Sequence, residues 1–74
     1  MTCIASMRSM TYAMKAKHAL TDQGIPCEIT SLDPSMTARG CAYGVKFNCV
    51  YESAVKNTLT KSGISYSQML TLPL

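Results

Sequence analysis

The sequence LTDQGI at residues 20–25 recurs in type and spacing as LTKSGI at residues 59–64. In each copy a glycine stands where helices commonly end in a left-handed residue, and the isoleucine after it can pack against the last turn. Pro26 then prevents the first helix from continuing. Either a duplicated unit or two independent uses of a good helix stop would explain the match. In both cases the chain contains two helices that end alike.

Short strand patterns flank these two helices. We expect strands at residues 2–6, 27–32, 43–48 and 66–72, and helices at about residues 10–23 and 52–62. The third strand has the clearest pattern, because Tyr43, Val45 and Phe47 alternate with Gly44 and polar residues. The resulting order, β-α-β-β-α-β, predicts an α+β, ferredoxin-like fold with an antiparallel sheet and two helices on one face.

Each helix has a predicted start and a predicted buried face. Ser9 or Thr11 is expected to cap the first helix, since a hydroxyl side chain can accept a free N–H there. The inner stripe of that helix is expected to contain Ala13, Ala16 or Lys17, and Leu20. The corresponding face of the second helix is expected to contain Ala54, Val55, Thr58 and Leu59.

Size and composition favour a carrier or a binding module over a stand-alone enzyme. The 74 residues, 47% of them hydrophobic, form one small domain (1–74) with a net charge of +3, which leaves little room for a deep cleft. Scattered lysines give no nucleic-acid patch, and no apolar run reaches the length of a membrane span. The first residues lack the features of a signal peptide. We therefore expect a cytoplasmic protein with four free thiols and with no metal and no cofactor.

Cys41 is the candidate reactive residue. It lies in the run ARGCAYG at residues 38–44, where Arg39 can stabilise a thiolate and the two glycines, Gly40 and Gly44, allow a tight turn and close approach by a partner. The expected topology places the start of the first helix at the same end of the sheet as this loop. Arg8, Ser9 and Thr11, with the free N–H groups of the helix start, would therefore face Cys41.

Two other motifs point to different functions. Residues 1–6, MTCIAS, are similar to the metal-binding M-T-C-x-x-C motif, but Ser6 replaces the second thiol, so Cys3 is interpreted as a buried strand residue. Residues 39–47 are similar to the RNP1 signature of RNA recognition motifs, but Cys41 replaces a stacking aromatic residue. The strand face that carries Lys46 offers no aromatic ring either, so RNA binding is the third-ranked interpretation.

A third resemblance covers most of the chain. Residues 9–16 (SMTYAMKA), residues 24–26 (GIP) and residues 39–44 (RGCAYG) resemble, in this order, a family of small bacterial selenium/sulfur carrier-like domains. Ala42 stands where the family pattern has glycine. The resemblance implies that Cys41 accepts sulfur or selenium as a persulfide or perselenide from a desulfurase-like donor enzyme. An acceptor enzyme would then remove the outer atom.

The main alternative is a non-catalytic interaction module. The uncovered face of such a sheet could pair in a homodimer or bind a protein partner, burying surface that a small monomer exposes. Cys3, Cys27 and Cys49 are expected on strands and are assigned to packing. Cys27 follows Pro26 and is the next candidate for a redox partner.

Overall fold

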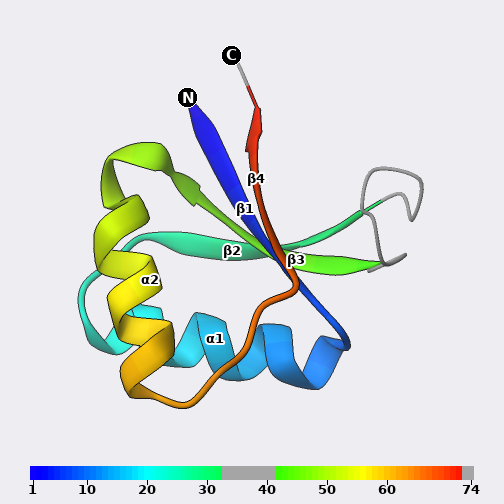
Figure 1. Ribbon diagram of the computed structural model, residues 1–74, viewed down its shortest axis with the longest axis horizontal. Coiled ribbons are helices and arrows are strands. Elements are labelled where there is room, and N and C mark those ends of the chain that lie inside the picture. Colours follow the sequence, from blue (N-terminus) through cyan, green and yellow to red (C-terminus); the bar gives the residue numbers. More distant parts are fainter. Residues whose placement is uncertain (33–41, 73–74) are drawn as a thin grey trace.

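The computed structural model describes residues 1–32 and 42–72 of the chain (Figure 1). Its elements are β1 (Thr2–Met7), α1 (Met10–Asp22), β2 (Cys27–Ser31), β3 (Tyr43–Asn48), the short 3-10 helix η2 (Cys49–Tyr51), α2 (Glu52–Lys61) and β4 (Gln68–Leu72). The predicted α+β class is confirmed: the described residues form a four-stranded antiparallel sheet and two α-helices.

The sheet has the strand order β2-β3-β1-β4, and every neighbouring pair is antiparallel. At one end Met7 of β1 pairs with Tyr43 of β3, and Tyr43 also pairs with Ser31 of β2. At the same end Ser6 pairs with Gln68, the first residue of β4. All four strands therefore begin or end at this end of the sheet. In the sheet, β1 lies between β3 and β4.

The start of α1 is fixed by a side-chain cap. The N–H of Tyr12 donates to Ser9 Oγ at 3.4 Å, and Ser9 has extended backbone geometry. Of the two predicted capping residues, Ser9 is therefore the cap, and Thr11 is an exposed residue of the first turn.

Both helices end as the repeated sequence predicts. Gly24 and Gly63 have positive φ angles of 74° and 70°, which glycine adopts without the strain that other residues incur. The isoleucine that follows each glycine donates its N–H to the leucine carbonyl five residues earlier, at 3.0 Å for Ile25 to Leu20 and 2.9 Å for Ile64 to Leu59. This bond turns the chain back toward the sheet.

The core lies between the two helices and one face of the sheet. Alternate residues of the central strands point into it, so the period-two pattern expected for β3 is confirmed. Helix α1 contributes its predicted stripe of Ala13, Ala16 and Leu20, and α2 contributes Val55 and Leu59. The residues of this core that are at most 3% exposed are Cys3, Ala5, Met7, Ala13, Ala16, Leu20, Val45, Phe47, Val55 and Leu59.

Some predicted details are wrong. Ala54 is exposed and Thr58 is half-buried, so α2 buries a narrower stripe, made of Val55 and Leu59. Cys49 belongs to η2 rather than to a strand, because Asn48 Oδ1 accepts the N–H of Val50 at 3.0 Å and turns the chain into a helix. The first strand extends one residue further than expected, and the last begins two residues later.

Candidate functional site

The end of the sheet where Met7 pairs with Tyr43 carries most of the predicted site residues. Leu32 follows β2 and Ala42 precedes β3, and the N–H of Leu32 donates to the carbonyl of Ala42 at 2.7 Å. The turn between β1 and α1 lies at this same end, as the topology predicted. Arg39, Gly40 and Cys41 lie outside the described residues.

Arg8 and Ser9 follow β1 directly at this end. Arg8 is exposed, and with Ser65, Tyr66 and Ser67 it lines a hollow of about 260 Å³. The segment before β4 is held there because the N–H of Ser67 donates to the carbonyl of Ser6 at 2.8 Å. Sequence reasoning missed Ser65, Tyr66 and Ser67, since nothing in their local sequence indicates which strand they will lie beside.

Gly44 lies within β3, on the sheet face opposite the helices. A Cβ built on Gly44 would lie 2.6 Å from Ile4 Cγ2 and 3.1 Å from Leu32 Cδ1. Ile4 and Leu32 are only 4% and 7% exposed, so this face of the sheet is partly apolar and closely packed. The absence of a side chain at Gly44 is thus needed for packing, whereas its predicted role in partner access remains a prediction.

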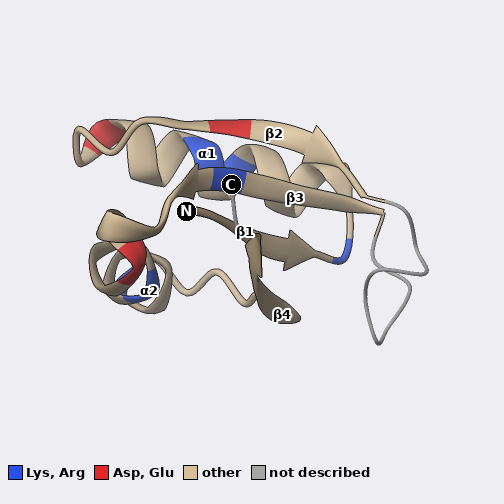
Figure 2. Cartoon of the chain, turned by 90° about the horizontal axis from the view of Figure 1, so that it is seen from above, with Lys and Arg blue, Asp and Glu red and all other residues tan. Residues whose placement is uncertain are grey.

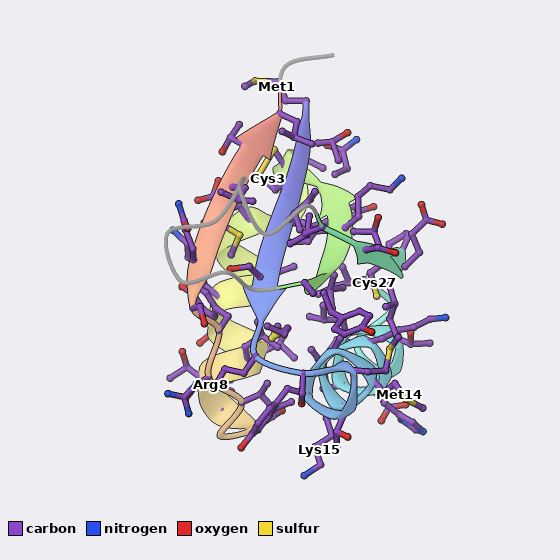
Figure 3. The ribbon with its side chains drawn as sticks, turned by 90° about the vertical axis from the view of Figure 1, so that its right-hand side faces the viewer. Met1, Cys3, Arg8, Met14, Lys15 and Cys27 are labelled. Atoms are coloured by element: carbon purple, nitrogen blue, oxygen red, sulfur yellow. A yellow bond between two sulfur atoms is a disulfide. The ribbon has the colours of Figure 1, made fainter. Side chains whose placement is uncertain are left out.

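The expectation of four free thiols is wrong, because Cys3 and Cys49 form a disulfide (Figure 3). Their Cα atoms are 5.1 Å apart, and the residues are separated by 46 positions in the sequence. Cys3 is fully buried on β1, whereas Cys49 is half-buried at the start of η2. Sequence reasoning missed the bond because β1 and the end of β3 become neighbours only when the sheet forms.

Cys27 is a free thiol at the start of β2. Its Sγ donates to the carbonyl of Lys17 at 3.8 Å. Burial raises the pKa of the Cys27 thiol above its ordinary value, and the Thr21 side chain and the Lys17 charge offset this only in part. Cys27 is therefore a poorer nucleophile at neutral pH than an unperturbed cysteine, because less of it is thiolate.

The disulfide and the Arg8 hollow lie at opposite ends of β1. Thr2, next to Cys3, pairs with Asn48, whereas Met7 pairs with Tyr43 at the other end. Met7 is four positions after Cys3, and at about 3.3 Å per residue this corresponds to about 13 Å along the strand. The disulfide and the Arg8 hollow are therefore two separate places on the described part of the molecule.

The metal and RNA interpretations gain no support from the described residues. No group of three or more His, Cys, Asp or Glu side chains gathers in residues 1–32 and 42–72 in a way that could hold a metal ion. Ser6, at the second position of the metal motif, is buried and donates to the carbonyl of Gln68 at 3.0 Å. Among the described residues, lysine and arginine are spread over the turn after β1, α1, β3 and α2 (Figure 2), and Lys46 is paired with Glu28 at 2.7 Å.

Within the described residues, no helix has both the length and the apolar character needed to cross a membrane.

A model of the family described as "Putative Se/S carrier protein-like" matches residues 2–71 of the chain. Searches among curated proteins and among solved structures find no match.

Proposed function

Since this chain belongs to the Se/S carrier protein-like family over residues 2–71, we propose that it carries sulfur or selenium on Cys41. The observation that carries this proposal is the family match, which spans nearly the whole chain. The local sequence supports it, because Cys41 is the only cysteine with an adjacent glycine and a nearby arginine, Arg39.

The state of the other cysteines also favours Cys41. Cys3 and Cys49 are bonded to each other in the structure, so neither is available as a nucleophile in this oxidised form. Cys27 has a raised pKa, which lowers its thiolate fraction. A carrier needs one accessible thiolate, and Cys41 is the cysteine that these arguments leave.

The proposed transfer consists of two exchanges at sulfur. The Cys41 thiolate attacks the outer sulfur of a donor enzyme's persulfide, and the donor thiolate leaves. Cys41 then carries S–SH, and a nucleophile of the acceptor enzyme takes the outer sulfur and regenerates the Cys41 thiolate. For selenium the outer atom is selenium, and the steps are the same.

Charge near the site would assist these steps. Arg8 lies at the end of the sheet where β3 begins, and Ala42, the residue after Cys41, lies at that end. Arg39 and Arg8 would stabilise the thiolate and the persulfide anion, while Gly40 and Gly44 would leave room for the donor and the acceptor. The capped start of α1, with Ser9 and Thr11, adds partial positive charge at the same end.

The proposal also includes the fold, the cellular location and the partners of the protein. The element order and the antiparallel strand order β2-β3-β1-β4 support a ferredoxin-like fold for a single domain of residues 1–74. A carrier supplied by a desulfurase-like enzyme would work in the cytoplasm, where donor thiols are kept reduced. Its partners would be one donor and one acceptor enzyme rather than a nucleic acid or a membrane.

The test is sulfur loading followed by peptide mass spectrometry. The protein is incubated with a cysteine desulfurase and cysteine, and in parallel with the same enzyme and selenocysteine, and each cysteine is then examined separately. Trypsin places Cys3, Cys27, Cys41 and Cys49 on four different peptides, because it cleaves after Arg8, Lys17, Arg39, Lys46 and Lys56. We expect a sulfur- or selenium-sized mass gain on the peptide that contains Cys41.

Two variants decide the outcome. Cys41→Ser should lose the mass gain, and Cys27→Ser, which removes the other free thiol, should keep it. Equal labelling of Cys27 and Cys41, or no labelling of either, would contradict carrier function at Cys41.

A further inference from the structure

Cys3 and Cys49 lie beside a carboxylate at the end of the sheet away from Ala42. We propose that Cys3, Cys49 and Glu52 form a second sulfur site, one that exchanges its disulfide reversibly with an external thiol. Cys49 would be the residue attacked, Cys3 the leaving group, and Glu52 the group that exchanges a proton with Cys3. The proposal does not depend on the proposed function, because Cys41 takes no part in it.

The backbone holds the two sulfur-bearing residues together independently of the sulfur–sulfur bond. Cys3 is fixed within β1, between β3 and β4, where it pairs with Phe47 and Thr71. The N–H of Cys49 donates to the carbonyl of Met1 at 3.1 Å, which ties the start of η2 to the start of the chain. These bonds would keep the two Cα atoms near their 5.1 Å separation after reduction, so the disulfide could form again.

The two cysteines differ in access to solvent. Cys3 is fully buried, whereas Cys49 is half-buried and is followed by Val50, which is 80% exposed. Thiol–disulfide exchange requires an incoming thiolate to reach the sulfur that it attacks. The incoming thiolate therefore reaches Cys49 Sγ, and Cys3 is displaced.

A carboxylate lies next to the buried sulfur. Glu52 Oε1 is 3.8 Å from Cys3 Sγ, a distance at which a Cys3 thiol can donate its hydrogen to the carboxylate. The other oxygen, Oε2, is paired with Lys56 at 2.9 Å, which holds the carboxyl group in place. Thr71 Oγ1 also lies 3.8 Å from Cys3 Sγ and can donate to a Cys3 thiolate.

The exchange can be written so that atoms and electrons balance. A thiolate RS⁻ attacks Cys49 Sγ, the Cys3–Cys49 bond breaks, and Cys3 leaves as a thiolate that receives a proton by way of Glu52. A second thiolate then attacks the sulfur of the bound R group, RSSR is released, and Cys49 leaves as a thiolate that takes a proton from solvent. The sum is one disulfide plus two RSH giving Cys3–SH, Cys49–SH and RSSR. In the reverse direction Glu52 accepts the Cys3 proton, so that Cys3 can attack.

Other charged and titratable groups surround the pair. Lys56 is bonded to Glu52, and Tyr66 interacts electrostatically with Lys56. Tyr51 packs against the core two residues after Cys49. Variation of the exchange rate with pH must therefore be compared with a variant that changes Glu52 alone.

The first experiment uses the wild-type protein in its oxidised form. It is equilibrated in mixtures of reduced and oxidised dithiothreitol, free thiols are alkylated, and the four tryptic cysteine peptides are quantified while circular dichroism follows folding. We expect Cys3 and Cys49 to become alkylated together at one midpoint, with folded-state circular dichroism retained and the pair re-forming on reoxidation. Reduction only together with unfolding would show a purely structural disulfide and would overturn the proposal.

A second experiment identifies the residue that is attacked. Cys3→Ser and Cys49→Ser are each exposed to glutathione disulfide in the folded state. We expect a mixed disulfide on Cys49 in Cys3→Ser, and at least about 10-fold slower modification of Cys3 in Cys49→Ser, because Cys3 is buried. Faster modification of Cys3 than of Cys49 would contradict the assigned order. If either variant does not fold, mapping the mixed disulfide trapped on wild type with excess glutathione decides the same point.

A third experiment tests Glu52. Glu52→Gln should slow reduction by dithiothreitol by about 10-fold or more and change its pH profile, while Glu52→Asp should restore part of the rate. Glu28→Gln is the matched control, since Glu28 is also ion-paired to a lysine, at 2.7 Å, but belongs to the edge strand β2, which β3 separates from the strand that carries Cys3. An unchanged rate and pH profile in Glu52→Gln would exclude a role for this carboxylate in proton exchange.

Discussion

The two ends of β1 differ in how their chemistry is encoded in the sequence. At the Met7 end, the candidate residues come from two short runs of sequence: Arg8 and Ser9 directly follow β1, and the run ARGCAYG leads into β3. At the Thr2 end, the chemistry depends on a pair, Cys3 and Cys49, that is 46 residues apart in the chain. A local motif could identify the first end, whereas only the assembled sheet reveals the second.

We predict that sulfur loading at the Met7 end of β1 and disulfide exchange at the Thr2 end proceed independently. The double variant Cys3→Ala/Cys49→Ala should still gain sulfur on Cys41, whereas Cys41→Ser should lose all loading and keep the Cys3–Cys49 disulfide. The reason is the distance of about 13 Å along β1 between Cys3 and Met7. Peptide mass spectrometry of both variants after treatment with a desulfurase measures both properties at once.

Loss of loading in a double variant that is still folded would contradict this separation. It would indicate that the Cys3–Cys49 pair supplies electrons or sulfur to the other end through a second molecule. Circular dichroism of the same sample distinguishes that result from simple unfolding.

The second prediction concerns stability at the Thr2 end. Reduction of the disulfide should lower the free energy of unfolding by about 2–4 kcal/mol, because the bond closes a long loop and restricts the unfolded chain. Urea unfolding of the wild-type protein with and without dithiothreitol measures the difference. The double variant should show no response to dithiothreitol, and an equal response in both proteins would attribute the effect to something other than this bond.

Particular elements show how far sequence reasoning reaches. The helix ends at Gly24 and Gly63 and the alternating face of β3 were predicted, because each depends on neighbouring residues and on backbone conformation. The exposure of Ala54 was not predicted, because an alanine suits either face of a helix. Only the way in which α2 packs on the sheet decides which of its faces is buried.

Prediction of the candidate site from sequence was also limited by contacts between residues that are distant in the chain. Arg8 and Ser9 were placed at the correct end of the sheet by topology alone. Tyr66 and the serines beside it were missed, because they approach Arg8 only through the pairing of β4 with β1. The disulfide was missed because β1 and η2 are distant in sequence, and no spacing rule relates Cys3 to Cys49.

The third prediction tests the packing of the sheet near the Met7 end. Gly44→Ala should destabilise the protein by about 1–3 kcal/mol, since the new methyl group would lie 2.6 Å from Ile4 Cγ2 and force the neighbouring atoms to move. Thermal and urea unfolding measure the change. The Cys3–Cys49 disulfide should remain intact, because the clash lies on the face of the sheet opposite the core that contains Cys3.

A double variant tests the cause of that destabilisation. Ile4→Ala removes the Cγ2 atom that the new methyl group would contact, so Gly44→Ala should be less damaging in the Ile4→Ala background. Strictly additive effects would show that the clash with Ile4 is not responsible, and would direct attention to the carbonyl of Ala5, 3.1 Å from the same position.

The smallest predicted effect concerns the start of α1, where two hydroxyl residues serve as each other's control. Ser9→Ala should cost about 1 kcal/mol, because the N–H of Tyr12 loses the Ser9 Oγ acceptor at 3.4 Å. Thr11→Ala should change stability by less than about 0.5 kcal/mol, since Thr11 is exposed and is not the cap. Urea unfolding of the two variants side by side measures the difference, and equal costs would refute the assignment of Ser9 as the cap. Because Ser9 follows Arg8, a frayed helix start in Ser9→Ala would also displace the Arg8 charge, which lies at the same end of the sheet as Ala42. The same variant should therefore load sulfur on Cys41 more slowly. Thr11→Ala should load at the wild-type rate, which separates the position of the helix start from the mere presence of a hydroxyl group there.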